Sequence, residues 1–126
     1  INCDFKVLMS QLSKRDFTLA QSLWVAQYND PMNILERFKS KLNVKNYPGW
    51  EQAEYVELLE RSFYEEGEQR LDTLAQAESI FAEEMPVCPI YHWDMTYLVQ
   101  PYLCNVEMSP IGDIVFNTLS INKTKK

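Results

Sequence analysis

Residues 24–35 read Trp24-Val25-Ala26-Gln27-Tyr28-Asn29-Asp30-Pro31-Met32-Asn33-Ile34-Leu35. Asn29 and Asp30 favour a turn, and proline suits the first position of a helix capped by an aspartate. Ile34, Leu35 and Phe38 then follow at helical spacing. The stretch therefore predicts an extended segment that stops near Tyr28 and a short helix that begins at Pro31.

Two strands are predicted on the N-terminal side of this turn. From Asn2 to Met9, apolar and polar residues alternate with the period of two that is typical of a half-buried strand. Phe17 to Val25 alternates in the same way, and Trp24 ends the face that carries Ala20 and Ser22. A large aromatic residue at a strand end is expected at the rim of a sheet.

Two amphipathic helices are predicted after a loop from Ser40 to Trp50. Glu51–Phe63 and Glu68–Glu84 both carry apolar residues at helical spacing. The residues expected to face inward are Tyr55, Leu58, Leu59 and Phe63 in the first helix, and Leu71, Leu74, Ala75, Ala77 and Phe81 in the second. The acidic residues of both helices are interpreted as solvated faces, with a scaffold role for this acidic pair as an alternative.

Short strands are predicted in the last third of the chain. Val87–Trp93 is apolar, and Pro89 within it indicates an edge strand or a crossing segment. Met95–Val99 and Ile114–Leu119 are two further candidate strands.

The composition is that of one globular domain or part of one. A length of 126 residues rules out a two-domain enzyme, and 46% hydrophobic with 24% charged residues requires a core. The net charge of -6 argues against nucleic acid and against an anionic membrane surface as partners. Cys3, Cys88 and Cys104 fit neither a disulfide framework nor a zinc site, so no metal is expected and the three are interpreted as small buried residues.

Catalytic chemistry has little support in the sequence. Cys88, His92 and Asp94 are the one candidate set for a hydrolase, which is kept as an alternative. On a strand, Cys88 and His92 would lie about 13 Å apart, which is far beyond hydrogen-bond reach. The motifs of serine hydrolases, zinc proteases and phosphate-binding loops are absent from the sequence, so no catalytic residue and no cofactor are expected.

Four blocks of the sequence carry a family pattern in the same order. They are residues 24–35; Arg70 with Ala77-Glu78-x-Ile80-Phe81 and Met85-Pro86-Val87-Cys88-Pro89-Ile90-Tyr91; Tyr97-Leu98-Val99-x-Pro101; and Ile111-Gly112-Asp113-Ile114-x-Phe116. Together they resemble the oligopeptide and dipeptide solute-binding proteins of bacterial ABC importers, known as solute-binding protein family 5. The resemblance runs from about Phe17 to Ile121, which is nearly the whole chain.

The resemblance implies an α/β chain that is the C-terminal portion of a two-lobed periplasmic binding protein of the type II fold. Residues 1–90 would be the C-terminal part of the second lobe, and residues 91–126 would hold the hinge crossing and the return to the first lobe. A chain that begins at Ile1 rather than at methionine fits such a fragment. Proteins of this family capture peptides and deliver them to a permease by lobe closure, without a chemical step.

The same resemblance implies the partners and the compartment. A peptide ligand and an ABC transporter permease are the expected partners, at a periplasmic or extracytoplasmic location. Contact with the membrane would come only through the permease or through a lipid anchor upstream of this chain.

Five ligand-binding residues are implied by the resemblance. Trp24 would flank a ligand side-chain pocket, Val25 would pair with the peptide by its main chain, and Trp93 would approach from the hinge side. Gln27 stands where family members carry the aspartate that binds the amino group of the peptide, and an amide offers only a neutral acceptor. Tyr28 either contacts the ligand or packs under the helix at Pro31. Because of Gln27, a modified or cell-wall peptide, or a non-peptide solute such as a metal complex or a sugar, remains an alternative ligand.

Overall fold

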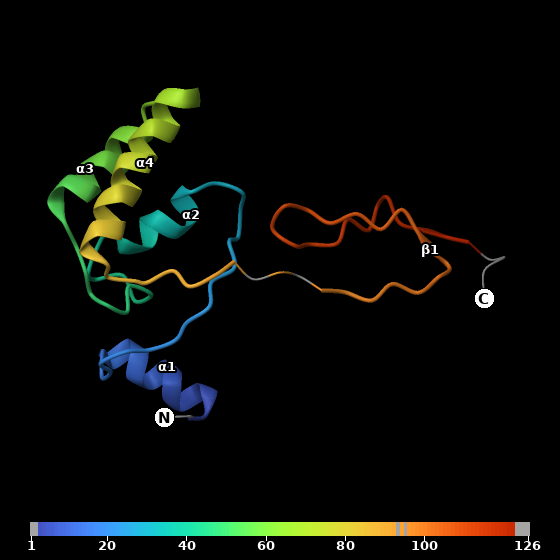
Figure 1. The fold of residues 1–126 in the computed structure, drawn as a ribbon, viewed down its shortest axis with the longest axis horizontal. Helices are drawn as coiled ribbons and strands as arrows, with labels where there is room; N and C mark the ends of the chain where they lie inside the picture. Colours follow the sequence, from blue (N-terminus) through green and yellow to red (C-terminus); the bar gives the residue numbers. More distant parts are fainter. Residues whose placement is uncertain (1–2, 93, 95, 123–126) are drawn as a thin grey trace. The chain divides into compact units, whose positions relative to one another are not determined.

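A computed structural model describes residues 3–92, 94 and 96–122, and these divide into two compact units (Figure 1). The first unit is Ile1–Trp24 with Asp30–Pro89, and it holds four α-helices and one 3-10 helix. The second unit is Val25–Asn29 with Ile90–Lys126, and it holds two short strands. The described part of the chain is thus a mixture of helices and strands, with the helices in the first unit.

The core of the first unit lies between helices α3 (Ala53–Ser62) and α4 (Gly67–Glu84), which run side by side (Figure 1). Gln52 caps α3 because its side-chain oxygen accepts a hydrogen bond from the Tyr55 amide at 2.6 Å. Gly67, at a φ of 56°, begins α4 in a conformation that favours glycine. The two helices predicted from residues 51–63 and 68–84 are confirmed.

The buried faces of these helices match the prediction only in part. Tyr55, Leu58, Leu59, Leu74, Ala77 and Phe81 are buried as expected. Phe63 is 62% exposed because it lies beyond the last residue of α3. Leu71 and Ala75 are also exposed, because the buried stripe of α4 instead includes Thr73. The predicted inward face was therefore too wide on one side.

A short helical segment closes this core from the side of the Asp30 turn. Helix α2 (Met32–Leu35) continues directly into the 3-10 helix η1 (Glu36–Phe38). The predicted short helix is confirmed, but it begins at Met32 rather than Pro31, and Pro31 rather than Asp30 is at the N-cap position. The Asp30 side chain still supports the helix start, because its Oδ1 accepts a hydrogen bond from the Met32 amide at 2.8 Å. Tyr55 joins the two parts, since its hydroxyl donates to the Leu35 carbonyl oxygen at 2.7 Å.

The loop predicted from Ser40 to Trp50 is also confirmed. Asn46, 1% exposed, holds it together because its side-chain nitrogen donates to the Ser40 and Trp50 carbonyl oxygens at 2.9 and 2.7 Å. Trp50 in turn packs edge-on against Tyr55 and Phe81.

The strand predicted from Asn2 to Met9 is wrong, because the structure has helix α1 (Phe5–Lys14) there. The Asp4 side chain accepts a hydrogen bond from the Lys6 amide at 2.8 Å and caps the helix, which ends at Lys14 with Arg15 as its C-cap. The buried position of α1 is Leu12, which the alternating pattern did not include.

The strand predicted from Phe17 to Val25 is wrong as well, since these residues have no regular structure. Leu19, Leu23 and Val25 are largely exposed. A strand requires a neighbour for its backbone hydrogen bonds, and the described residues provide none for this segment.

In the second unit, strand β1 (Leu103–Cys104) pairs antiparallel with β2 (Ser120–Ile121). Leu103 is opposite Ile121, and an isolated bridge joins Met108 to Ile114. Within the described residues, no strand forms in the predicted segments 87–93 and 95–99, and only the bridge at Ile114 falls in the predicted strand 114–119. Trp93 and Met95 lie outside the described residues.

The cysteines differ from the expectation of buried residues. Cys88 is exposed, and Cys3 and Cys104 are only partly buried. All three are free thiols.

Candidate functional site

Trp24 is the predicted ligand-binding residue with the most defined surroundings. It is half-buried, and its Nε1 donates to Oδ1 of the buried Asn33 at 3.3 Å. The guanidinium of Arg37 lies over the Trp24 ring, and Nζ of Lys45 is 5.3 Å from the ring centroid. We call Trp24, Asn33, Arg37 and Lys45 the Trp24 cluster.

Two chain features build this cluster. Asn33 lies on α2, and Arg37 lies one turn further along on η1, so both approach the ring from the helical segment that follows the Asp30 turn. Lys45 comes from the loop that Asn46 holds in place. The indole is thus fixed on one edge by a hydrogen bond and on its face by a cation.

One nitrogen of the Arg37 guanidinium lacks a polar partner among the described residues. Its Nη2 atom is buried and has no hydrogen-bond partner among the residues that the structure describes. Removal of the group from water lowers the pKa of Arg37 to about 10, because desolvation penalises the charged form.

An ion pair fixes the turn that separates Trp24 from α2. Arg70 on α4 donates two hydrogen bonds to the Asp30 carboxylate, at 2.8 and 2.9 Å. The pKa of Asp30 lies below its ordinary value, and the main cause is the hydrogen bonding from the Arg70 guanidinium, which favours the charged carboxylate. This contact joins residues 40 positions apart, and it anchors the turn that follows the predicted ligand-binding residues Trp24 to Tyr28.

The other predicted site residues are divided between the units. Val25, Gln27 and Tyr28 belong to the second unit, with Val25 60% and Tyr28 43% exposed. Trp93 lies outside the described residues. The structure therefore places Trp24 in a defined cluster of the first unit, and it assigns Val25, Gln27 and Tyr28 to the second unit.

The candidate hydrolase residues are also divided between the two units. Cys88 belongs to the first unit, whereas His92 and Asp94 belong to the second. All three side chains are exposed. Among the described residues, no group of three or more His, Cys, Asp or Glu side chains could hold a metal ion.

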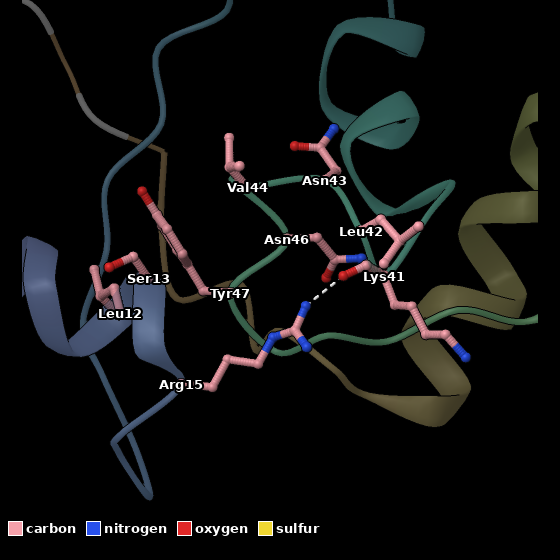
Figure 2. Close-up of a pocket in the computed structure, with 9 residues that line it drawn as sticks. All are labelled: Leu12, Ser13, Arg15, Lys41, Leu42, Asn43, Val44, Asn46 and Tyr47. Atoms are coloured by element: carbon pink, nitrogen blue, oxygen red, sulfur yellow. Dashed lines mark hydrogen bonds between the residues drawn. The ribbon is translucent and has the colours of Figure 1, made fainter.

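Two hollows among the described residues lie elsewhere. One of about 270 Å³ separates the end of α1 from the loop 41–47, where Arg15 donates to the Lys41 carbonyl oxygen beside Asn46 and Tyr47 (Figure 2). The other, of about 290 Å³, lies on α3 and α4 beside Glu54, Glu57 and Arg61. Neither contains a predicted ligand-binding residue.

Sequence reasoning missed Asn33, Arg37 and Lys45, and it did not pair Asp30 with Arg70. Asp30, Asn33 and Arg70 all stand inside the blocks that carry the family pattern, so that pattern contained a signal for them. Arg37 and Lys45 lie outside those blocks, and only the fold brings them to the Trp24 ring.

None of the helices in the described part of the chain is long and apolar enough to cross a membrane.

Comparisons with known proteins identify relatives of this chain. It is 35% identical over 116 residues to the oligopeptide-binding protein OppA of Bacillus subtilis. This match covers 91% of this chain and 21% of OppA. It is 28% identical over 115 residues to YgiS of Escherichia coli, named as a probable deoxycholate-binding periplasmic protein, with 90% of this chain and 21% of YgiS covered. The chain thus spans about one fifth of the length of these relatives. No family model matches the chain.

A solved structure of the pheromone receptor PrgZ, described with its mode of peptide binding, superposes on this chain. The TM-score is 0.76 at 31% sequence identity, and the match covers 98% of this chain and 24% of PrgZ. The predicted α/β fold class, part of a periplasmic binding protein, is confirmed by this match. The predicted resemblance to the oligopeptide- and dipeptide-binding proteins of solute-binding protein family 5 is therefore confirmed, over nine tenths of this chain and about one fifth of the length of such a protein.

Proposed function

We propose that this chain is part of the extracytoplasmic solute-binding component of an ABC importer that captures oligopeptides. The observation that carries the proposal is the 35% identity to an oligopeptide-binding protein over 91% of the chain. The named relatives are binding proteins rather than enzymes, which supports binding and delivery to a permease without a chemical step. A periplasmic or extracytoplasmic location follows from this role, with an upstream lipid anchor as one means of retention.

The function requires two lobes that close over the peptide. In this proposal residues 1–90 contribute to the second lobe, and residues 91–126 hold the hinge crossing and the return to the first lobe. A ligand shifts the closure equilibrium only by its differential affinity for the closed state, so both lobes must contact the peptide.

The proposed binding segment is the extended stretch that runs from Trp24 to Tyr28. Val25 offers its main-chain groups to the peptide as an added strand, which gives affinity without reading the sequence of the peptide. Trp24 and Trp93 flank the ligand, Gln27 faces its amino end, and Tyr28 lines the same stretch. The exposure of Val25 and Tyr28 and the anchoring of Asp30 by Arg70 support this assignment, because a binding segment must be accessible and held in place.

A different solute is the second candidate, and Gln27 favours it. Without a carboxylate at this position, the amino end of an ordinary peptide loses a charge-assisted hydrogen bond. A modified or cell-wall peptide, or a non-peptide solute, does not need that contact. The similarity to a protein named for deoxycholate binding makes a bile acid the most direct non-peptide probe.

Isothermal titration calorimetry with the full-length protein tests the proposal. We expect saturable binding of an unmodified pentapeptide, accompanied by a smaller radius of gyration in small-angle X-ray scattering as the lobes close. The isolated 126-residue chain should give no measurable heat, because it lacks most of one lobe. Saturable binding of deoxycholate without a response to any peptide would favour the second candidate, and tight peptide binding by the isolated chain would contradict the two-lobed site.

A further inference from the structure

Two cations meet at the Trp24 ring, and neither has a carboxylate partner among the residues that the structure describes. Within the described part of the chain, the ion pairs are Lys39 with Glu60, Arg61 with Glu65, and Arg70 with Asp30. Arg37 and Lys45 take part in none of these pairs, although the chain as a whole carries a net charge of -6. The acidic surplus of the chain is therefore not used to neutralise the Trp24 cluster.

The Arg37 guanidinium also has hydrogen-bonding capacity that the described residues do not use. The indole underneath it is fixed by the hydrogen bond to Asn33, so the guanidinium plane has a rigid support. Its buried Nη2 atom has no hydrogen-bond partner among the described residues, and a buried polar group without a partner costs free energy. The lowered pKa of Arg37 has the same cause, which is removal of the charge from water.

A carboxylate is the ligand group that fits this arrangement. A planar guanidinium donates two parallel N–H bonds to the two oxygens of a carboxylate, and Lys45 adds a second positive charge on the same ring. A polyanion such as nucleic acid would instead meet the acidic remainder of the chain.

We propose that Arg37 and Lys45 form a subsite that binds a carboxylate of the peptide ligand beside Trp24. The proposal rests on the proposed function, because it takes Trp24 to flank a side-chain pocket of the ligand. The subsite would make the protein prefer peptides with an acidic side chain, or with their terminal carboxylate, at the position that Trp24 flanks.

Matched peptides test this in the full-length protein. Pentapeptides with glutamate or glutamine at each position in turn, and with a free or amidated C-terminus, are titrated by calorimetry. At one position we expect the carboxylate form to bind about fivefold to tenfold more tightly than its amide counterpart, since a charge-assisted pair replaces a neutral one. In Arg37→Met, which keeps an apolar stem on Trp24, that ratio should fall to about one.

The control is Lys39→Met, two residues away. Lys39 is a cation with its own partner, Glu60 at 3.3 Å, so its removal should leave the ratio between carboxylate and amide peptides unchanged. Arg37→Lys, which keeps the charge but not the planar fork, should retain part of the preference and guards against a loss of folding in Arg37→Met.

Two outcomes would overturn the proposal. One is a wild-type protein that binds every carboxylate peptide and its amide counterpart equally. The other is a preference that survives in Arg37→Met with full strength, which would show that another group binds the carboxylate. Failure of all peptides, neutral ones included, would instead overturn the proposed function, and the subsite with it.

Discussion

Gln27 is the residue at which the chemistry of this chain departs most clearly from the family pattern. If Gln27 faces the amino end of a peptide, Gln27→Asp in the full-length protein replaces a neutral acceptor by a carboxylate. We expect peptides with a free amino terminus to gain about 1 to 2 kcal/mol, or roughly tenfold in affinity, because an ion pair forms in a cleft that closure desolvates. Calorimetry with one peptide and both proteins measures this gain.

The N-acetylated form of the same peptide is the control for Gln27. It carries no ammonium group, so its affinity should not rise in Gln27→Asp. Equal gains for the free and the acetylated peptide would show that Gln27 does not face the amino terminus.

Among the elements, α4 is joined to the Asp30 turn before α2 by the Arg70–Asp30 ion pair, and this contact decides how firmly the turn is held. Both partners are about one quarter exposed, so solvent screens the pair only in part. Arg70→Met should lower the free energy of unfolding by about 1 to 3 kcal/mol, because it removes two charge-assisted hydrogen bonds and leaves the Asp30 carboxylate with less support. Urea denaturation of the full-length protein measures the change.

The dependence on pH separates the Asp30–Arg70 pair from a simple loss of packing. The pKa of Asp30 lies below its ordinary value of 3.8 in the folded state, so folding favours the carboxylate. This stabilisation is present above that ordinary value and is lost as the pH falls through the lower pKa of the folded protein. The difference between wild type and Arg70→Met should therefore shrink in acid. Lys39→Met, which breaks a more exposed pair with Glu60, should cost at most about 1 kcal/mol at neutral pH; a cost equal to that of Arg70→Met would contradict this account.

The elements also show why some of the fold could be predicted from sequence and some could not. Helices α3 and α4 repeat their apolar residues at helical spacing and pack against each other, so the pattern and its partner lie in the same stretch of chain. At Asn2–Met9 the alternation was short, and the Asp4 cap and the burial of Leu12 favoured a helix instead. The predicted strands depended on neighbouring strands, which a period of two does not identify.

The candidate site divides in the same way. The sequence pattern identifies Trp24 and the Asp30 turn because turn chemistry is local. Arg37 and Lys45 become relevant only through their position over the Trp24 ring, and that position depends on η1 and on the loop that Asn46 fixes. A contact between residues distant in the chain leaves no periodic signal.

At the scale of the whole molecule, the chain leaves much apolar surface uncovered. Tyr64, Ile90, Leu98 and Phe116 are among the large hydrophobic residues that are at least three quarters exposed. In the described residues the only paired strands are two residues long each. Soluble proteins rarely expose so many large apolar side chains unless another surface covers them.

We therefore expect the isolated 126-residue chain to be unstable compared with the full-length protein, in which the remaining four fifths of the relatives' length would supply the covering surfaces and the missing strands. The isolated chain should bind a hydrophobic dye such as ANS strongly and should sediment as a mixture of aggregates, whereas the full-length protein should do neither.

Substitution of Leu98, which is 100% exposed, by lysine offers a matched test. It should reduce aggregation of the isolated chain and should destabilise the full-length protein by about 2 to 5 kcal/mol, because there the charge would be buried against an apolar surface. A full-length Leu98→Lys protein as stable as wild type would show that this surface faces solvent in the intact molecule.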